Sequence, residues 1–262
     1  MNMTPSTTRM GAYNGNSMSL LDHASPQDRR ATLGSYPTRN IEIACLRADH
    51  TLMFETVKVP RIQVFEEAAG AFAQGTLLLT DTGEIAIEDL QPGDRVATSI
   101  GTTARVLWIG SSSFAPPRVS ATRTPLLRIM DDAFGSGQPG RYLTVGPNAR
   151  LLHTPPHLRG QFGETPLMTP VGEFVDGVNV IEVTPPTPVR LFQLVLDRHA
   201  AIKANGLLFE TFHPGLQAFS GQPYAMRELF MSMFPHLTHF ADFGPLAHPR
   251  APASDQKLSN VG

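Results

Sequence analysis

The stretch that decides the fold is Phe72–Thr98, which reads FAQGTLLLTDTGEIAIEDLQPGDRVAT. It begins with an apolar run, turns at Gly83, continues with Ile85 and Ile87 alternating with polar residues, and turns again at Pro92–Asp94. Glycine adopts positive φ at no steric cost and proline fixes its own φ, so these residues are typical of turns between strands. The stretch therefore predicts a β-meander of three strands.

The landmarks of this stretch resemble the opening of the Hint domain, the fold shared by inteins and the autoprocessing part of hedgehog proteins. Members tend to read Cys-Phe-x-x-Gly-Thr, then an apolar strand, and later Glu-Asp-Leu-x-Pro-Gly-Asp-x-Val. This chain reads AFAQGT from Ala71 and EDLQPGDRV from Glu88. The resemblance, which is to bacterial Hint proteins, implies a mostly β fold of many short strands.

One landmark is missing, because Ala71 stands where the resemblance places the cysteine. In the family, a thiol or hydroxyl there attacks the preceding carbonyl, which here belongs to Gly70. A methyl group has no lone pair, so residue 71 cannot form an acyl intermediate. Glycine would suit a strained scissile bond. With an alanine after it, however, Ile62–Gly70 is more simply interpreted as a linker.

A second stretch, Tyr142–Leu152, resembles the family's second catalytic block, in which an apolar strand leads to Thr or Ser and, three residues later, to His. That histidine protonates the amide nitrogen of the scissile bond. The resemblance places it at Ala149 and the Thr or Ser at Gly146. His153 follows four residues later, about 13 Å further along an extended strand, which argues against its replacing the missing ring.

The third stretch contains Val189–Leu196, an alternating strand, and Ala201–Ala204, a returning strand that ends in the hairpin signal Asn205-Gly206. Asp197 and His199 lie at the corner between the two strands. The stretch resembles the C-terminal blocks of Hint domains, and the resemblance maps these two residues onto the family's acidic and imidazole pair.

The end of this stretch excludes intein splicing. Inteins end in His-Asn, and the asparagine cyclises to release the flanking segment. Here the last strand runs into Glu210 and Thr211, so no asparagine is available at that point. Hedgehog-like bacterial relatives end in Glu, then Ser or Thr, an aromatic residue, any residue, Pro and Gly, and residues 210–215 reproduce this pattern.

Two other chemistries remain open. Asp197, His199 and Glu210 are adequate metal ligands, although a hydrogen-bonded structural cluster is the favoured interpretation. Self-cleavage by an atypical nucleophile would use Thr76 or Cys45, with His199 or His153 as proton carrier. For Cys45 we favour a small buried residue on an apolar stripe over a reactive thiol.

Composition limits the remaining functions. The formal net charge is −2, from 21 basic and 23 acidic residues, which gives no electrostatic case for nucleic acid or an anionic membrane. Cys45 is the only cysteine, so neither an intrachain disulfide nor a cysteine-based zinc site can form. The Gly135–Gly137 loop lacks the lysine and helix start of a phosphate-binding motif. We expect no cofactor and no resident metal.

The chain divides into four predicted parts: a mobile tail (1–37), a β-hairpin (38–69), the Hint-like domain (70–215), and a C-terminal helix with a tail (216–262). Ile41, Ile43 and Cys45 share the apolar face of the hairpin. Trp108 is expected in the core with one partner for its N–H. The last part has apolar residues at helical spacing, which we expect to pack on the β-body. These residues are Met226, Leu229, Phe230, Met233 and Phe234.

These features predict a degenerate Hint domain that keeps the scaffold without self-cleavage and serves as a structural or interaction module for a protein partner. The alternative is an autoproteolytic domain with an atypical nucleophile. The first residues show neither a secretory signal nor a long apolar run, so we expect a cytoplasmic protein, with unconventional secretion left open. The histidines near the C-terminus, His236, His239 and His248, are expected at the surface.

Overall fold

The computed structural model describes residues 36–115, 125–163, 165–215 and 217–252. The predicted tails at both ends therefore fall almost wholly outside the described residues, as do residues 116–124.

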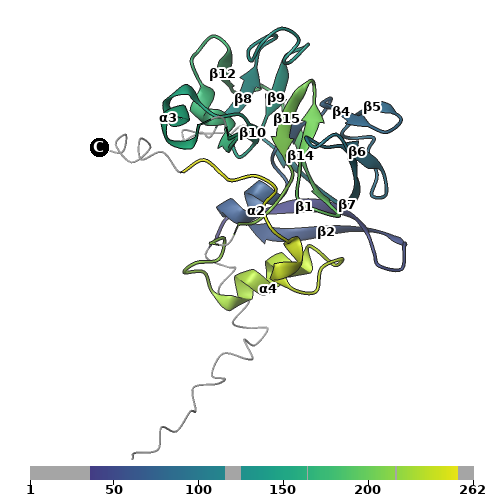
Figure 1. The fold of residues 1–262 in the computed structure, drawn as a ribbon. Coiled ribbons are helices and arrows are strands. Elements are labelled where there is room, and N and C mark those ends of the chain that lie inside the picture. Colours follow the sequence, from purple (N-terminus) through teal and green to yellow (C-terminus); the bar gives the residue numbers. More distant parts are fainter. Residues whose placement is uncertain (1–35, 116–124, 164, 216, 253–262) are drawn as a thin grey trace, which may run out of the picture.

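Short strands dominate the described residues, as the sequence predicts, and helices are few (Figure 1). The strands are β1 (Thr38–Leu46), β2 (Leu52–Pro60), β3 (Phe72–Ala73), β4 (Leu77–Thr80), β5 (Gly83–Ala86), β6 (Arg95–Ala97), β7 (Thr103–Phe114), β8 (Leu126–Ile129), β9 (Leu143–Val145), β10 (Arg150–Leu152), β11 (Met168–Pro170), β12 (Val180–Val183), β13 (Val189–Leu196), β14 (Ala201–Ala204) and β15 (Leu207–Glu210). The helical elements are α2 (Gln63–Ala68), η1 (Pro156–Leu158), α3 (Arg159–Phe162), η2 (Val171–Phe174), α4 (Tyr224–Ser232) and η3 (Phe240–Phe243). None of the described helices has both the length and the apolar character needed to cross a membrane.

The strands join in the order β11-β10-β15-β14-β4-β6-β7-β13-β3-β9-β8-β12, with β1, β2 and β5 attached at the sides. This order corrects the predicted meander. β4 pairs with both β5 and β6, because Thr80 lies opposite Gly83 on one side and Val96 on the other. The chain between β5 and β6 buries Ile87 and Leu90 in the core. It therefore crosses to the far edge of β4, and β6 does not continue beside β5.

The predicted N-terminal hairpin is present and is part of the main sheet. β1 and β2 pair in register from Thr38 opposite Pro60 to Leu46 opposite Leu52. β1 then pairs with β7, with Cys45 opposite Trp108. The three residues of the predicted apolar face, Ile41, Ile43 and Cys45, are buried. The hairpin is thus continuous with the strands of the Hint-like region.

The segment that we interpret as a linker, Ile62–Gly70, contains the helix α2, which corrects that prediction. Val64, Phe65 and Ala68 are buried on one side of it. These residues are at positions i, i+1 and i+4, which lie on one face of a helix. Apolar burial on this face explains why the segment is helical although it is only six residues long.

The C-terminal helix packs as predicted. Met226, Phe230, Met233 and Phe234 join the hairpin's apolar face and Phe65 in one buried cluster, and α4 lies against the hairpin in Figure 1. The indole N–H of Trp108 donates to the Met233 carbonyl oxygen at 2.6 Å, which supplies the one partner expected for it. The chain after residue 215 therefore closes a second core around the hairpin.

Candidate functional site

The Gly70–Ala71 bond lies between α2 and β3 and is held by backbone hydrogen bonds. The N–H of Ala71 donates to the Phe192 carbonyl oxygen at 3.0 Å, and the Ala71 carbonyl oxygen accepts from the N–H of Gly146 at 2.7 Å. Ala71 is buried. The place where the resemblance puts the nucleophile is therefore fixed on both sides and shielded from water.

Gly146 lies directly against the carbonyl of Gly70. A Cβ atom added to Gly146 would be 1.7 Å from the oxygen of Gly70 and 2.8 Å from its carbonyl carbon. Gly70 is equally constrained, since a Cβ there would lie 2.5 Å from the Glu66 carbonyl oxygen. Both positions require glycine, because in each case a backbone carbonyl oxygen occupies the space that a Cβ would take.

Ala149 lies in the same buried region. Its N–H donates to the Gly146 carbonyl oxygen at 3.2 Å, and its carbonyl oxygen accepts from the N–H of Val171 at 2.9 Å. Ala71 and Ala149 belong to one cluster of buried apolar side chains. The two positions that the resemblance assigns to a thiol and an imidazole are thus occupied by methyl groups in the core.

His153 is taken up by aromatic packing. Its ring centroid lies 5.1 Å from that of Phe134 and 5.5 Å from that of Phe174. Burial, together with Arg159, lowers the pKa of His153. This environment favours a neutral ring that packs against apolar neighbours.

Thr76 and Cys45 are each engaged elsewhere. The buried hydroxyl of Thr76 donates to the Ala73 carbonyl oxygen at 2.7 Å within a turn. The sulfur of Cys45 lies 3.4 Å from Nδ1 of His236, and burial raises the pKa of this thiol to about 11. Burial also lowers the pKa of His236 to about 4. Near neutral pH Cys45 is therefore a protonated thiol beside an uncharged imidazole. A protonated thiol is a poor nucleophile.

The contact with Cys45 places His236 at the edge of the second core, which corrects the prediction that it is a surface residue. The ring centroid of His236 lies 6.3 Å from that of Phe234, which belongs to the buried cluster around α4. His239 is exposed, as expected. His248 is only partly exposed and lies 3.2 Å from the Ser99 hydroxyl.

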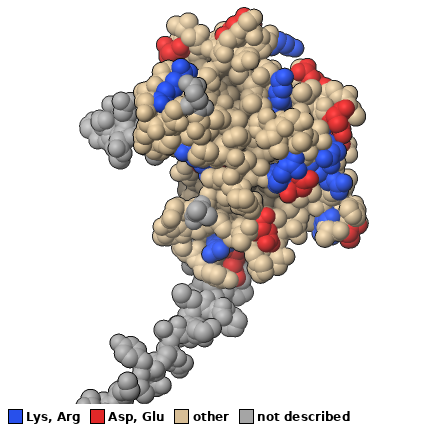
Figure 2. Space-filling view, viewed as in Figure 1, with Lys and Arg blue, Asp and Glu red and all other residues tan. Residues whose placement is uncertain are grey.

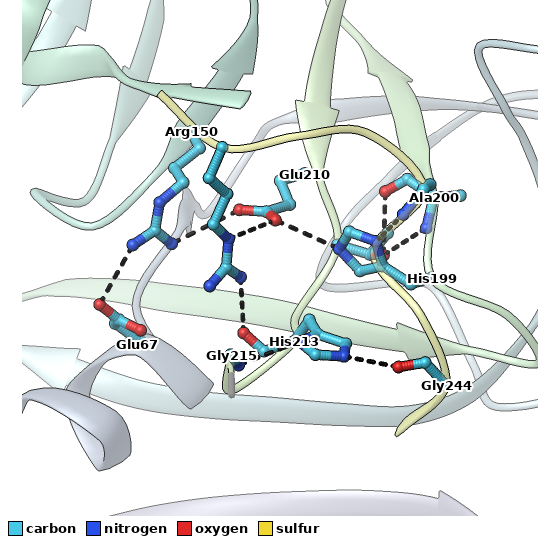
Figure 3. Close-up of polar contacts among 11 residues, drawn as sticks. Glu67, Arg150, His199, Ala200, Glu210, His213, Gly215 and Gly244 are labelled. Atoms are coloured by element: carbon cyan, nitrogen blue, oxygen red, sulfur yellow. Dashed lines mark hydrogen bonds and ion pairs between the residues drawn. The ribbon is translucent and has the colours of Figure 1, made fainter. Parts of the chain in front are cut away.

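A charged cluster surrounds Glu210, at the end of β15 (Figure 3). Its side chain is 3% exposed. Nε of Arg250 donates to one carboxylate oxygen at 2.8 Å, and Nη1 of Arg150 lies 3.4 Å from the other. Nε2 of His199 lies 3.3 Å from Oε1, at an ion-pair distance but outside good hydrogen-bond geometry. Arg150 also reaches Glu67, at 3.5 Å.

Electrostatics keep Glu210 ionised. Burial by itself would raise the pKa of this carboxyl, but His199, Arg250 and Arg150 together hold it below its ordinary value. His199 accepts the N–H of Ala247 at Nδ1, 2.9 Å away, so a neutral ring carries its proton on Nε2, facing the carboxylate. The cluster therefore alternates positive and negative groups, as buried charges require.

A segment near the C-terminus closes this cluster. Besides Glu210, Arg250 binds the His213 carbonyl oxygen through Nη2 at 2.7 Å. On either side of Arg250, Pro249 accepts from and Ala251 donates to the backbone of Met168, at 2.9 and 3.1 Å. Sequence reasoning missed Arg250, because nothing near it is periodic. The available signal was the carboxylate that the Hint-like pattern places at the end of a buried strand, since such a group needs a cation.

Asp197 does not join His199. The Asp197 side chain is 39% exposed and lies 3.9 Å from Arg198, whereas the His199 side chain is almost fully buried. Both residues lie in the corner between β13 and β14, where the chain bends at Asp197 and Arg198, so the two side chains do not share a face as positions i and i+2 of a strand would. Among the residues that the structure describes, no three His, Cys, Asp or Glu side chains are grouped so as to hold a metal ion. The proposed ligand set of Asp197, His199 and Glu210 is therefore not assembled.

The chain is similar to one family model and to several solved structures. The Hint domain family model matches residues 70–216. A bacterial intein-like domain from Clostridium thermocellum is similar at 16% identity, with 55% of this chain and 99% of that chain covered and a TM-score of 0.36. A DnaB intein from Synechocystis sp. PCC 6803 is similar at 14% identity, with 55% and 99% covered and a TM-score of 0.33. No curated protein matches the chain. Because the family model spans more than half of its residues, this chain belongs to the Hint domain family.

Proposed function

We propose that this protein is a Hint domain that does not cleave itself and that serves as a structural or interaction module. The observation that carries the proposal is the environment of the Gly70–Ala71 bond. Ala71 supplies no nucleophile, and the backbone of Gly146 lies against the Gly70 carbonyl that a nucleophile would attack. Ala149 supplies no proton to a leaving nitrogen.

The position of the hairpin supports the same proposal. Cleavage at Gly70–Ala71 would separate residues 1–70 from the rest of the chain. Yet β1 pairs with β7 from Glu42 to Cys45, and the hairpin shares a buried apolar cluster with α4. The hairpin is thus part of the folded body, and scission would not free it under native conditions.

The charged cluster also supports a structural role. A general acid or base must present a group that can exchange a proton with the reacting atoms. Glu210 is instead surrounded by three cationic or imidazole partners, and Nδ1 of His199 accepts from a backbone N–H of the C-terminal segment. These contacts hold the segment around Arg250 against the strands.

Intact mass tests the proposal. The purified chain is incubated with and without a thiol or hydroxylamine and is then denatured before mass spectrometry, because a cleaved hairpin would stay attached in the native state. We expect one unchanged mass in every sample. A pair of fragments with a junction near Gly70 would contradict the proposal.

The alternative of self-cleavage by an atypical nucleophile requires access to the bond. A cavity of about 410 Å³, lined by Gly70, Asn148 and Arg39 among others, opens beside the bond. If fragments form, the variants Thr76→Ala and Cys45→Ala test which residue is the nucleophile. Loss of fragments in one of these variants would identify the nucleophile, and fragments that persist in both would exclude these two candidates.

A further inference from the structure

A second groove shares no lining residue with the cavity at Gly70. Its volume is about 650 Å³, and it is formed by the N-terminal hairpin, the strands β7 and β13, and the chain between β5 and β6. The lining residues are Glu42, Ile43, Ala44, Phe54, Glu55, Thr56, Ile87, Glu88, Asp89, Leu90, Gln91, Pro92, Ile109, Ser111, Arg190 and Phe192. None of Gly70, Ala71 and Ala149 is among them.

The floor of the groove is a face of the sheet. One row of paired residues, Thr56, Glu42, Ser111 and Phe192, crosses β2, β1, β7 and β13 in register. Residues 87–92 form a wall beside this floor. A floor made by paired strands is rigid, so the groove is preformed, and a partner would not bear the entropy cost of ordering it.

The floor also presents an exposed aromatic ring. Phe54 is 72% exposed, and its strand partner Ala44 lies opposite Ile109 on the next strand. Ala44 is partly buried and Ile109 is buried in the core, so Phe54 is the member of this row that the described part of the chain leaves open. Exposed apolar surface with a polar rim is typical of a site where another molecule packs.

The rim is acidic. Of the lining residues, Glu42, Glu55, Glu88 and Asp89 carry carboxylates, and Arg190 is the one basic residue. Arg190 is already paired with Glu42. Glu88 accepts the N–H of Gly75, a contact that leaves its charge in place. Such a rim attracts cationic side chains and repels acidic ones. On the face drawn in Figure 2, acidic and basic residues are intermixed at the right-hand side.

The groove reaches the free edge of the sheet. Within the described residues, β2 pairs with β1 alone. Three consecutive residues of β2, Phe54, Glu55 and Thr56, line the groove, although neighbouring side chains point to opposite faces. The backbone edge of β2 is therefore accessible from the groove and can pair with another extended segment.

We propose that this groove binds an extended basic segment of a partner protein. A large apolar side chain of that segment packs on Phe54, and its Lys or Arg residues face Glu88 and Asp89. This inference rests on the proposed role as an interaction module and names the class of its partner.

Fluorescence anisotropy tests the groove with the full chain. The probe is a labelled nine-residue peptide in which lysine and valine alternate around a central phenylalanine, and the matched control peptide has glutamate in place of lysine. We expect saturable binding of the basic peptide that weakens as salt is raised, because the charges are solvent-exposed. The acidic peptide should not bind. Equal binding of both peptides, or binding of neither, would overturn the proposal.

Two variants locate the binding. Phe54→Ala should weaken binding about tenfold, and Glu88→Gln with Asp89→Asn should weaken it about fivefold. The matched controls are Tyr142→Ala, another exposed aromatic, and Glu84→Gln, an exposed carboxylate outside the groove. Controls that weaken binding as much as the groove variants would refute this location. An unchanged intact mass together with absent binding would refute the groove alone and leave the non-cleaving role standing.

Discussion

The Gly70 corner and the Glu210 cluster are two neighbouring regions with opposite contents. Asn148 lines both the cavity at Gly70 and a small cavity of about 10 Å³ at Glu210, and Arg150 follows directly after Ala149. The corner contains glycine and alanine and is closed by backbone contacts. The cluster contains buried charges. Hint domains are known for self-cleavage, yet in this chain the charged side chains lie in the Glu210 cluster and not at the Gly70–Ala71 bond.

The two regions hold the fold together in different ways. Arg250, Arg150 and His199 converge on Glu210, and through Arg250 they join the C-terminal segment to β15. In the corner, two glycines let β3 and the chain after β9 approach so closely that no side chain fits between them. Both regions bind distant segments together, one by ion pairs and the other by close backbone packing.

Removing the carboxylate of Glu210 should have the largest effect on the stability of the fold. In Glu210→Ala, Arg250 and Arg150 remain in the cluster without their shared partner. Breaking a buried ion pair in this way costs about 3–5 kcal/mol. We expect the free energy of unfolding, measured with denaturant, to fall by this amount. Glu182→Ala removes an exposed carboxylate from β12 and serves as the control. A loss no greater than in this control would mean that the cluster does not stabilise the fold.

A methyl group at Gly146 should have the next largest effect. In Gly146→Ala the new Cβ would meet the Gly70 carbonyl oxygen at 1.7 Å, and neither a backbone oxygen nor a Cβ can move away by changing a side-chain rotamer. Overpacking of this kind costs about 3 kcal/mol. Denaturant unfolding measures the loss. The matched control is Gly160→Ala, because Gly160 is exposed and has no neighbour within 4 Å of an added Cβ. Equal stability of the two variants would show that the corner is loosely packed.

The positions of strands and turns were more predictable from the sequence than the pairing of the strands. The strands and turns around Gly83, Pro92 and Asn205-Gly206 follow from local patterns, as does the α4 stripe. The identity of β4's neighbours does not, because the burial of Ile87 and Leu90 determines the path of the chain after β5. Local signals fix elements, whereas pairing depends on where distant apolar residues fit.

The same limit applies to the site. Landmark spacing locates positions 71 and 149 and so predicts what the corner lacks. It pairs His199 with Asp197, two residues earlier, although the group that His199 meets is Glu210. Arg250 lies 40 residues from Glu210 in a segment without periodicity, so only the folded chain shows that they meet. The loss of a catalytic group can be predicted from the residue type at one position. A charge cluster can be recognised only from the contacts between residues that are far apart in the chain.

Acidification should act on the cluster and leave the apolar corner unaffected. Nδ1 of His213 accepts from the N–H of Gly215, and Nε2 lies 3.0 Å from the Gly244 carbonyl oxygen, so the neutral ring fits both partners. Burial, the largest cause, lowers the pKa of His213, and His199 and Arg250 add to this. A histidine with a lowered folded pKa contributes stability that is full above about pH 6.5 and is lost as pH falls below it.

Glu210 adds a second step at lower pH. The pKa of Glu210 is held below its ordinary value, so its contribution is present above about pH 4.3 and is lost as pH falls further. We therefore expect denaturant stability to decline below pH 6.5 and again below pH 4.3. His213→Gln should reduce the first decline without abolishing it, because the pKa of His236 is also lowered, to about 4. His157→Gln, at an exposed position, is the control. An unaltered profile in His213→Gln would exclude His213 from the first step.

The smallest effect is expected from returning a thiol to the corner. In Ala71→Cys a nucleophilic atom stands beside the Gly70 carbonyl, but the leaving nitrogen still has no proton donor at residue 149. Adding one sulfur to a buried site should cost about 1 kcal/mol, and the denatured intact mass should stay unchanged with and without hydroxylamine. Ala71→Ser, which adds a smaller hydroxyl, is the matched variant. Fragments from Ala71→Cys alone would mean that another group, such as His199, can deliver the proton. The cluster would then belong to the reaction, and the separation between the two regions would fail.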